Sequence, residues 1–224
     1  RNANEKLALS YSKSGNKEKA LALANQLMQK AKDNKEKGSV DNLIAGIYYE
    51  AGDHKKAIEV CKTVIQNTDL DEETLINSYI TMSNSYKGLN DMGNAASILL
   101  QASEKFPESP EIPIVLYTLG AMYFDNQEYE KAASIFTKFV DKYPKHVNVK
   151  EARYFKAYSY YETGNWTVAS SSFRQYVANY PDDPAAAESQ FYAGEALYNA
   201  KEYNAAILEY RKTYQRYSST DYAP

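Results

Sequence analysis

Apolar residues recur along the chain at the spacing of an α-helix. Leu116, Leu119 and Tyr123 share one face of a first segment, and Ala132 and Phe136 share one face of the segment that follows. Residues three, four and seven apart lie on the same side of a helix. The pattern predicts a helical hairpin, with a helix A, a turn and a helix B.

The same pattern returns six times, at a spacing of 37 or 38 residues. An alanine marks each copy: Ala20, Ala57, Ala95, Ala132, Ala169 and Ala206. Twelve residues before each alanine stands a small residue: Ala8, Ala45, Ser83, Gly120, Ala157 and Gly194. Nine residues before it stands a large one: Tyr11, Tyr48, Tyr86, Tyr123, Tyr160 and Leu197. A fixed period of this length is typical of stacked structural repeats.

The small residues have a mechanical interpretation. Where helix A crosses helix B, glycine or alanine allows the two backbones to approach, and the larger neighbours fill the grooves. Between the two helices of a copy the sequence has mostly Gly, Asn and Asp, as in Gly15-Asn16 and Gly164-Asn165. These residues end helices and adopt left-handed backbone conformations.

We therefore expect an all-α protein with one domain over residues 1–224. The chain begins with Arg1, not Met, and we expect it to be a fragment of a longer chain. The expected hairpins cover about 3–32, 39–68, 74–107, 111–144, 148–181 and 185–217.

The fourth copy resembles the tetratricopeptide repeat, whose pattern is W-x2-L-G-x2-Y…A-x3-F…P. The matching residues are Leu116 in place of Trp, Leu119, Gly120, Tyr123, Ala132, Phe136 and Pro144. The resemblance covers essentially the whole chain and implies a right-handed α-solenoid that binds other proteins. The period differs, being 37 residues here instead of about 34, so each loop between copies should be longer.

Two of these loops, "DKYPKHVNVKEA" and "ANYPDDPAAAES", are similar in style to those of bacterial periplasmic members of the family. Such members include the lipoprotein that supports outer-membrane β-barrel assembly and the periplasmic partner of the Tol–Pal system. The resemblance implies a periplasmic or outer-membrane-associated location in a bacterium, with a cytoplasmic location as the alternative.

In solenoids of this family the A helices line the concave face, where partner segments bind. Counted from the small A-helix residue, positions −3, +1 and +4 face the hollow, and in the later copies they are rich in aromatic side chains. The expected partner-binding residues are Tyr117, Phe124, Tyr154, Tyr158, Tyr161, Phe191 and Tyr198. The earlier copies have Asn42, Gly46 and Ile80 at such positions. The open alternative is that the aromatic side chains only pack between adjacent A helices.

No motif for catalysis, cofactor binding or metal binding stands out. His54 and His146 have no cysteine or histidine partner at metal-binding spacing, so we expect both to be solvated surface residues. Cys61, four residues after Ala57, is expected to be a small buried filler. We expect no catalytic residue, no metal and no cofactor. No apolar run approaches the roughly 20 residues that a bilayer requires.

The charge argues against nucleic acid as a partner. The formal net charge is −3 and the isoelectric point is about 5.6, whereas nucleic-acid-binding domains are usually basic. An RNA-reading helical repeat is therefore the less favoured alternative. A clamp of paired Lys and Asn for a carboxy-terminal carboxylate is also disfavoured, because Asn42, Asn84 and Lys87 are scattered.

The sequence thus predicts a scaffold that binds a protein or peptide segment on its concave face, without enzymatic activity. The alternative is an accessory lipoprotein of outer-membrane assembly or of the envelope, which could have a membrane-associated partner. The last B helix has no following polar capping helix. We expect its apolar surface to be covered by further chain, by a partner or by self-association through this carboxy-terminal end.

Overall fold

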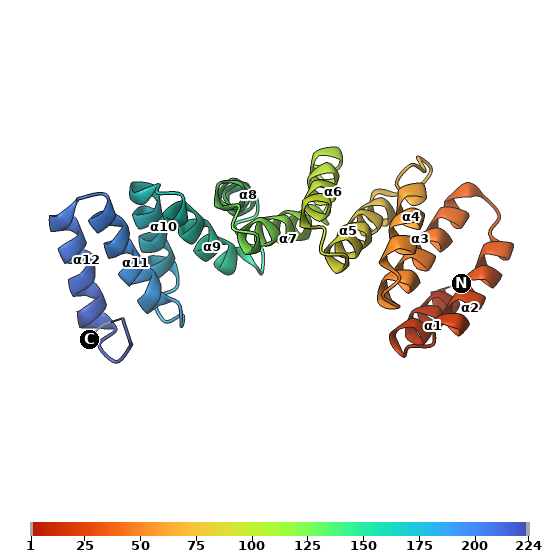
Figure 1. Ribbon diagram of the computed structural model, residues 1–224, viewed down its shortest axis with the longest axis horizontal. Helices are drawn as coiled ribbons and strands as arrows, with labels where there is room; N and C mark the ends of the chain where they lie inside the picture. Colours follow the sequence, from red (N-terminus) through yellow and green to blue (C-terminus); the bar gives the residue numbers. More distant parts are fainter. Residues whose placement is uncertain (1, 223–224) are drawn as a thin grey trace. The chain divides into compact units, whose positions relative to one another are not determined.

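A computed structural model describes residues 2–222 of the chain. The described residues form twelve α-helices and no β-strand, in six successive pairs (Figure 1). The pairs are α1 (Asn2–Lys13) with α2 (Lys17–Lys30), α3 (Asn34–Glu50) with α4 (His54–Val64), α5 (Glu72–Gly88) with α6 (Met92–Lys105), α7 (Ile112–Asp125) with α8 (Tyr129–Lys142), α9 (Val149–Glu162) with α10 (Trp166–Asn179), and α11 (Ala186–Asn199) with α12 (Tyr203–Arg216). The all-α helical-repeat fold expected from the sequence is confirmed.

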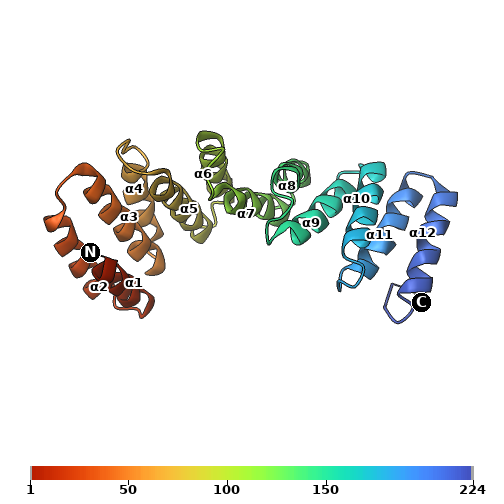
Figure 2. The same ribbon diagram turned by 180° about the vertical axis from the view of Figure 1, so that it is seen from behind.

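The backbone separates into two compact units, whose boundary falls within α7 between Val115 and Leu116. The amino-terminal unit ends at Val115, and the carboxy-terminal unit begins at Leu116. Within each unit a helix packs against the next one along the chain (Figures 1 and 2). One continuous domain over residues 1–224 remains a prediction.

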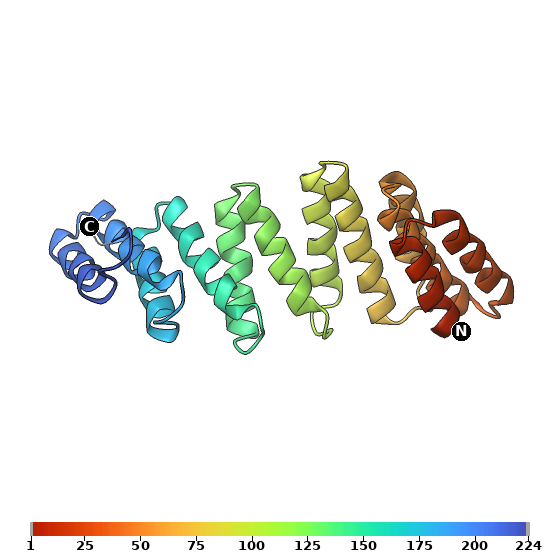
Figure 3. The ribbon, with the colours of Figure 1, turned by 90° about the horizontal axis from the view of Figure 1, so that it is seen from below.

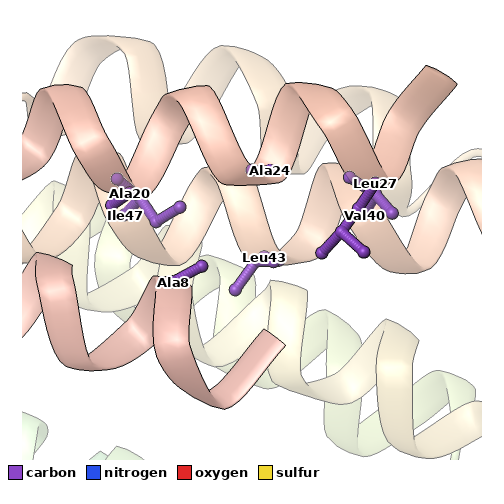
Figure 4. Packing of buried hydrophobic residues seen from close by; sticks show 7 residues of the cluster. All are labelled: Ala8, Ala20, Ala24, Leu27, Val40, Leu43 and Ile47. Carbon is purple, nitrogen blue, oxygen red and sulfur yellow. The ribbon is translucent and has the colours of Figure 1, made fainter. Parts of the chain in front are cut away.

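The core of the first pair shows how the repeat buries its apolar face. Small side chains of α1 and α2 meet branched side chains of α3, and partly buried Tyr11 and Met28 close the cluster from outside. The buried residues of this cluster are Ala8, Ala20, Ala24, Leu27, Val40, Leu43 and Ile47 (Figure 4). The first hairpin alone could not cover this surface, because α3 of the second hairpin supplies three of its four larger residues, and only Leu27 comes from α2.

The small residues lie at the helix crossings, as the sequence predicted. All six marker alanines are buried. The Ser83 hydroxyl of α5 donates a hydrogen bond of 2.8 Å to the Ala95 carbonyl of α6, so the two small positions of this pair are in direct contact. In α7, a Cβ atom at Gly120 would lie 2.8 Å from the Phe136 ring of α8. Larger side chains at these positions would separate the helices.

Each hairpin turn contains one residue with positive φ, at the same place in every copy. Figure 3 shows the short turns that join the helices of each pair. The residues are Gly15, Gly52, Asn90, Gln127, Gly164 and Lys201. Gly and Asn were expected in this role, since they adopt the left-handed region at low cost. Gln127 and Lys201 were not, and they show that the geometry of the hairpin overrides local preference there.

The A helices begin differently in the two units. In the amino-terminal unit an aspartate caps α3 and α5: Asp33 accepts a hydrogen bond from the Glu36 amide, and Asp71 accepts one from the Thr74 amide. In the carboxy-terminal unit Asn148 and Ala185 precede α9 and α11 without a side-chain cap. There the loops that contain Pro144 and Pro181 close tight turns before each A helix.

Candidate functional site

The seven aromatic residues expected to bind a partner all lie on the A helices of the carboxy-terminal unit. Tyr117 and Phe124 belong to α7, Tyr154, Tyr158 and Tyr161 to α9, and Phe191 and Tyr198 to α11. Six are half-buried, and Tyr198 is exposed, with 55% of its surface accessible. The structure therefore brings these residues together on successive helices but leaves different fractions of them accessible.

Both the ring and the hydroxyl of Tyr154 contact neighbouring helices. Its ring packs edge-on against Phe173 and Tyr176 of α10, with centroids 6.3 and 5.8 Å apart. Its hydroxyl donates a hydrogen bond of 2.9 Å to Glu188 of α11. Burial, together with the negative charge of Glu188, raises the pKa of Tyr154 well above its ordinary value. Tyr154 therefore links three helices of this unit.

Tyr158 and Tyr161 meet a third tyrosine, Tyr192, which the sequence analysis did not single out. The ring centroid of Tyr192 lies 5.4 Å from Tyr158 and 5.1 Å from Tyr161, and it stacks on Phe173 at 5.6 Å. Tyr192 stands two residues before the small residue Gly194, whereas the positions considered were −3, +1 and +4. Burial raises the pKa of Tyr158 and of Tyr161.

The other aromatic side chains also pack within the unit. Phe124 lies 4.7 Å from Phe155 and 5.7 Å from Tyr158, measured between ring centroids. Contacts of this kind are worth about 0.5–1.5 kcal/mol each beyond burial of area. Other pairs include Tyr117 with Phe139, Phe191 with Tyr210 and Tyr222, and Tyr198 with Tyr203. Packing is thus one role of the whole group, and partner binding by its exposed edges remains a prediction.

A hollow opens on the A-helix face of the amino-terminal unit. It is lined by side chains of α1, α3 and α5. The lining residues are Glu5, Leu9, Ser39, Asn42, Leu43, Gly46, Asn77, Ile80 and Thr81. We call this the amino-terminal hollow. Asn42, Gly46 and Ile80 were placed on this face by the repeat pattern, whereas Ser39, Asn77 and Thr81 were not.

Two features keep the amino-terminal hollow open and polar. A Cβ atom at Gly46 would have no heavy atom within 4 Å, so the helix surface there faces empty space. The Asn42 side-chain carbonyl accepts a hydrogen bond of 2.6 Å from the Ser78 hydroxyl, which fixes the amide. The Asn42 NH2 group then has no acceptor among the described residues. It is therefore a hydrogen-bond donor whose position is fixed by the bond to Ser78.

The two histidines differ from the expectation of solvated surface residues, because both are half-buried. The His54 ring lies against Gly88, where a Cβ atom would collide with its Nε2. The His146 ring lies 5.3 Å from Phe139, and its Nδ1 accepts a hydrogen bond from the Asn148 amide. Both act in packing between repeats. Cys61 is buried as expected, and burial raises the pKa of its thiol to about 12.

Among residues 2–222 there is no group of three or more His, Cys, Asp or Glu side chains placed to hold a metal ion. Over the same residues, no helix has the length and apolar character needed to cross a membrane.

Solved structures similar to this chain are helical-repeat proteins. A putative kinesin light chain of Podospora anserina with tetratricopeptide-like repeats has a TM-score of 0.60 at 19% identity, covering 80% of this chain and 93% of that one. A tetratricopeptide repeat protein of Parabacteroides merdae gives 0.58 at 16% identity, covering 96% and 79%. The Naa15/Naa10 complex bound to HypK gives 0.70 at 14% identity, covering 93% of this chain but 30% of the other. These likenesses support the fold.

Two family models match the sequence. A model described as an outer membrane lipoprotein (YfiO) matches residues 71–165. A tetratricopeptide repeat model matches residues 5–72 and again residues 154–220. Among curated proteins no relative matches the chain. Because the two matches to the repeat model together cover more than half of the residues, the chain belongs to the tetratricopeptide repeat family.

Proposed function

We propose that this protein is a scaffold without catalytic activity that binds a segment of a partner protein on its A-helix face. Tetratricopeptide repeats generally mediate contacts between proteins. The observation that carries the proposal is the amino-terminal hollow, formed by three successive A helices. Rigid helices position a binding surface at low entropic cost, which favours affinity.

The chemistry of the amino-terminal hollow suits an extended segment. The Asn42 NH2 group and the side chains of Asn77 and Thr81 can bond the peptide backbone, whose amides and carbonyls need partners when they leave water. Leu9 and Ile80 provide an apolar wall for one side chain of the segment. The space above Gly46 allows the backbone of that segment to approach the helix closely.

The aromatic group of the carboxy-terminal unit is the second surface of this proposal. Tyr198 is its most accessible member, and the half-buried rings of Tyr158 and Tyr161 present their remaining edges. Tyrosine contributes a wide apolar face and a hydroxyl at low entropic cost, and it is enriched in interfaces. These rings would contact apolar side chains of a partner.

The test starts from partners captured by crosslinking with the intact chain and then purified for affinity measurements. Gly46→Leu fills the amino-terminal hollow and should weaken binding at least about tenfold, since a contact worth about 1.4 kcal/mol is lost. Ala22→Leu is the control, because Ala22 is an exposed residue of the B helix α2 and does not line the hollow. Tyr158→Ser with Tyr161→Ser tests the aromatic surface. Unchanged affinity in both variants, with unchanged helicity, would refute the A-helix face as the binding surface.

The alternative is an accessory lipoprotein of outer-membrane assembly, located in the periplasm or at the outer membrane of a bacterium. The match of residues 71–165 to the outer membrane lipoprotein model favours it. Fractionation of cells that carry the full-length protein would distinguish it from the cytoplasmic alternative. Recovery in the soluble cytoplasmic fraction alone would rule the envelope role out.

Self-association is a further element of the proposal, and it concerns α12. Ile207 and Tyr214 of α12 are 48% and 63% exposed. Ser170 and Val177, at the same repeat positions of α10, are buried, and α10 packs against α11 of the next pair. We propose that a second copy covers this face of α12. Light scattering that shows a monomer at all concentrations would contradict this.

A further inference from the structure

A second hollow lies in the carboxy-terminal unit, away from the A-helix residues discussed above. It opens between the B helices α10 and α12, and Gln190 of α11 contributes to its floor. It is lined by Ser171, Arg174, Gln175, Val177, Ala178, Gln190, Glu209, Lys212 and Arg216. We call it the basic hollow, because three cationic side chains surround a single carboxylate.

The carboxylate at the floor of the hollow, that of Glu209, already has bonding partners within the protein. Glu209 is only 4% exposed. Its Oε2 accepts a hydrogen bond of 2.7 Å from the Gln190 amide, and the Lys212 ammonium lies 2.9 and 3.0 Å from its two oxygens. A buried charge requires such partners. Glu209 therefore neutralises Lys212 and fixes the floor.

Within residues 2–222, neither arginine of the basic hollow has a hydrogen-bonded carboxylate partner. The Arg174 Nε atom lies 3.9 Å from Glu209, too far for a hydrogen bond, and the Arg174 side chain is largely exposed. The Arg216 guanidinium lies over the Tyr217 ring at 5.6 Å. No ion pair involves Arg216 within residues 2–222. Arginine presents a planar set of donors that matches a carboxylate in two-point contact.

The neighbouring pair of B helices shows that this charge is not needed for packing. Between α8 and α10 the residues 37 positions before these four charged residues are uncharged. Thr137 corresponds to Arg174, Ser172 to Glu209, Gln175 to Lys212 and Asn179 to Arg216. The same helical arrangement thus forms without these charges. The concentration of cations is also local, since the whole chain has a net charge of −3.

We propose that the basic hollow docks an acidic segment of a partner protein, with carboxylates bound by Arg174 and Arg216. Charge complementarity selects this occupant, because Lys212 holds the close contacts with Glu209 and Arg174 reaches that carboxylate only at 3.9 Å. The guanidinium groups of Arg174 and Arg216 therefore remain available to carboxylates of a bound segment. An anionic membrane surface is a poorer match, since basic clusters that bind it usually contain four to eight cations. Gln175 and Ser171 border the hollow and add donors for the bound segment. This docking surface does not depend on the A-helix face.

The test uses the intact chain and a fluorescein-labelled peptide rich in glutamate, with a glutamine peptide of the same length as reference. Fluorescence anisotropy should show binding of the glutamate peptide that weakens as salt rises to about 0.5 M, because screening shortens the range of exposed charges. Arg174→Gln with Arg216→Gln should reduce the affinity roughly tenfold, as expected when two charged contacts are lost.

The matched control removes two cations outside the basic hollow, by Lys138→Gln with Arg211→Gln, and should leave the affinity within about twofold. Lys138 lies on α8 and Arg211 on α12, and both are exposed. Equal losses in the two double variants would show a general charge effect and overturn the proposal. So would tight binding to phosphatidylglycerol vesicles without binding of the glutamate peptide.

Discussion

The A-helix faces of the two units use the same repeat positions in opposite ways. In the amino-terminal unit these positions hold Asn42, Gly46 and Ile80, and a polar hollow results. In the carboxy-terminal unit they hold residues such as Tyr154 and Tyr158, whose rings pack on one another and on the next helix. The backbone pattern is common to both. Side-chain size at a few positions therefore decides whether the face is hollow or filled.

The comparison also distinguishes two roles of aromatic side chains, buried packing and surface exposure. Phe136 of α8 is fully buried and stacks on Phe155 of α9, so it supports the crossing of helices. Tyr198 of α11 is mostly exposed and touches only Tyr203 among the aromatic residues described. Rings of the first kind stabilise the fold, and rings of the second kind are available to a partner. Substitutions can therefore distinguish stability from binding.

The largest effect on the free energy of unfolding is expected at the position four residues after the marker alanine. Phe136→Ala should lower the free energy of unfolding by about 3–5 kcal/mol, because it removes a buried ring and leaves a cavity. Cys61, at the same position of α4, is also buried. Cys61→Ala should cost only about 1 kcal/mol, since little apolar surface is lost.

Urea unfolding can follow these variants by two signals. Trp166, the single tryptophan, lies in α10 and reports on the carboxy-terminal unit by fluorescence, while circular dichroism reports on all helices. The Phe136→Ala transition should shift strongly in the fluorescence signal. Equal losses for the two variants would show that the amino-terminal unit depends on its small core residues as strongly as the other unit depends on its rings.

The second prediction compares alanine substitutions at two glycines, whose effects on stability should differ in sign. Gly120→Ala should be destabilising by about 1–3 kcal/mol, because the added Cβ would press on the buried Phe136 ring. Gly46→Ala should be neutral or stabilising by up to about 1 kcal/mol, since alanine favours the helix and meets open space. Thermal unfolding followed by circular dichroism measures both. A destabilised Gly46→Ala variant would mean that the amino-terminal hollow is filled in solution.

The contacts between helices could be predicted because they depend on a repeated local rule. One small residue on each helix at fixed spacing is enough to identify a crossing, and Ser83 with Ala95 shows such a crossing directly. The hairpin turns could be predicted equally well wherever Gly or Asn has positive φ. Gln127 and Lys201 could not be anticipated, because the left-handed conformation there is imposed by the helices on either side and not by the residue itself.

The surfaces could be predicted only in part, because they depend on which way side chains turn. The repeat pattern placed Tyr158 and Tyr161 on the A-helix face but gave no sign that Tyr192 would join them. The burial of Glu209 could not be predicted from the repeat pattern either. Copies elsewhere have Ile98 or Ile135 at this position, and only the packing of Gln190 and Lys212 against the carboxylate explains its burial.

The smallest effect is expected where the A helices begin. Asp71→Ala should cost about 1 kcal/mol, because the Thr74 amide loses its side-chain acceptor at the start of α5. Asn148→Ala, at the start of α9, should change stability by less than about 0.5 kcal/mol, since Asn148 makes no capping hydrogen bond with its side chain. Chemical unfolding at neutral pH measures both variants against the parent.

The pH dependence sharpens this last comparison. The hydrogen bond from the Thr74 amide, followed by that from its hydroxyl, holds the pKa of Asp71 below its ordinary value. A lowered pKa means that ionised Asp71 stabilises the fold fully above its unfolded-state pKa, and that this contribution is lost as pH falls through the folded-state pKa. The difference between the parent and Asp71→Ala should therefore narrow in acid, whereas Asn148→Ala should show no such trend. A difference that stays constant across this range would show that the cap acts through its shape and not through its charge.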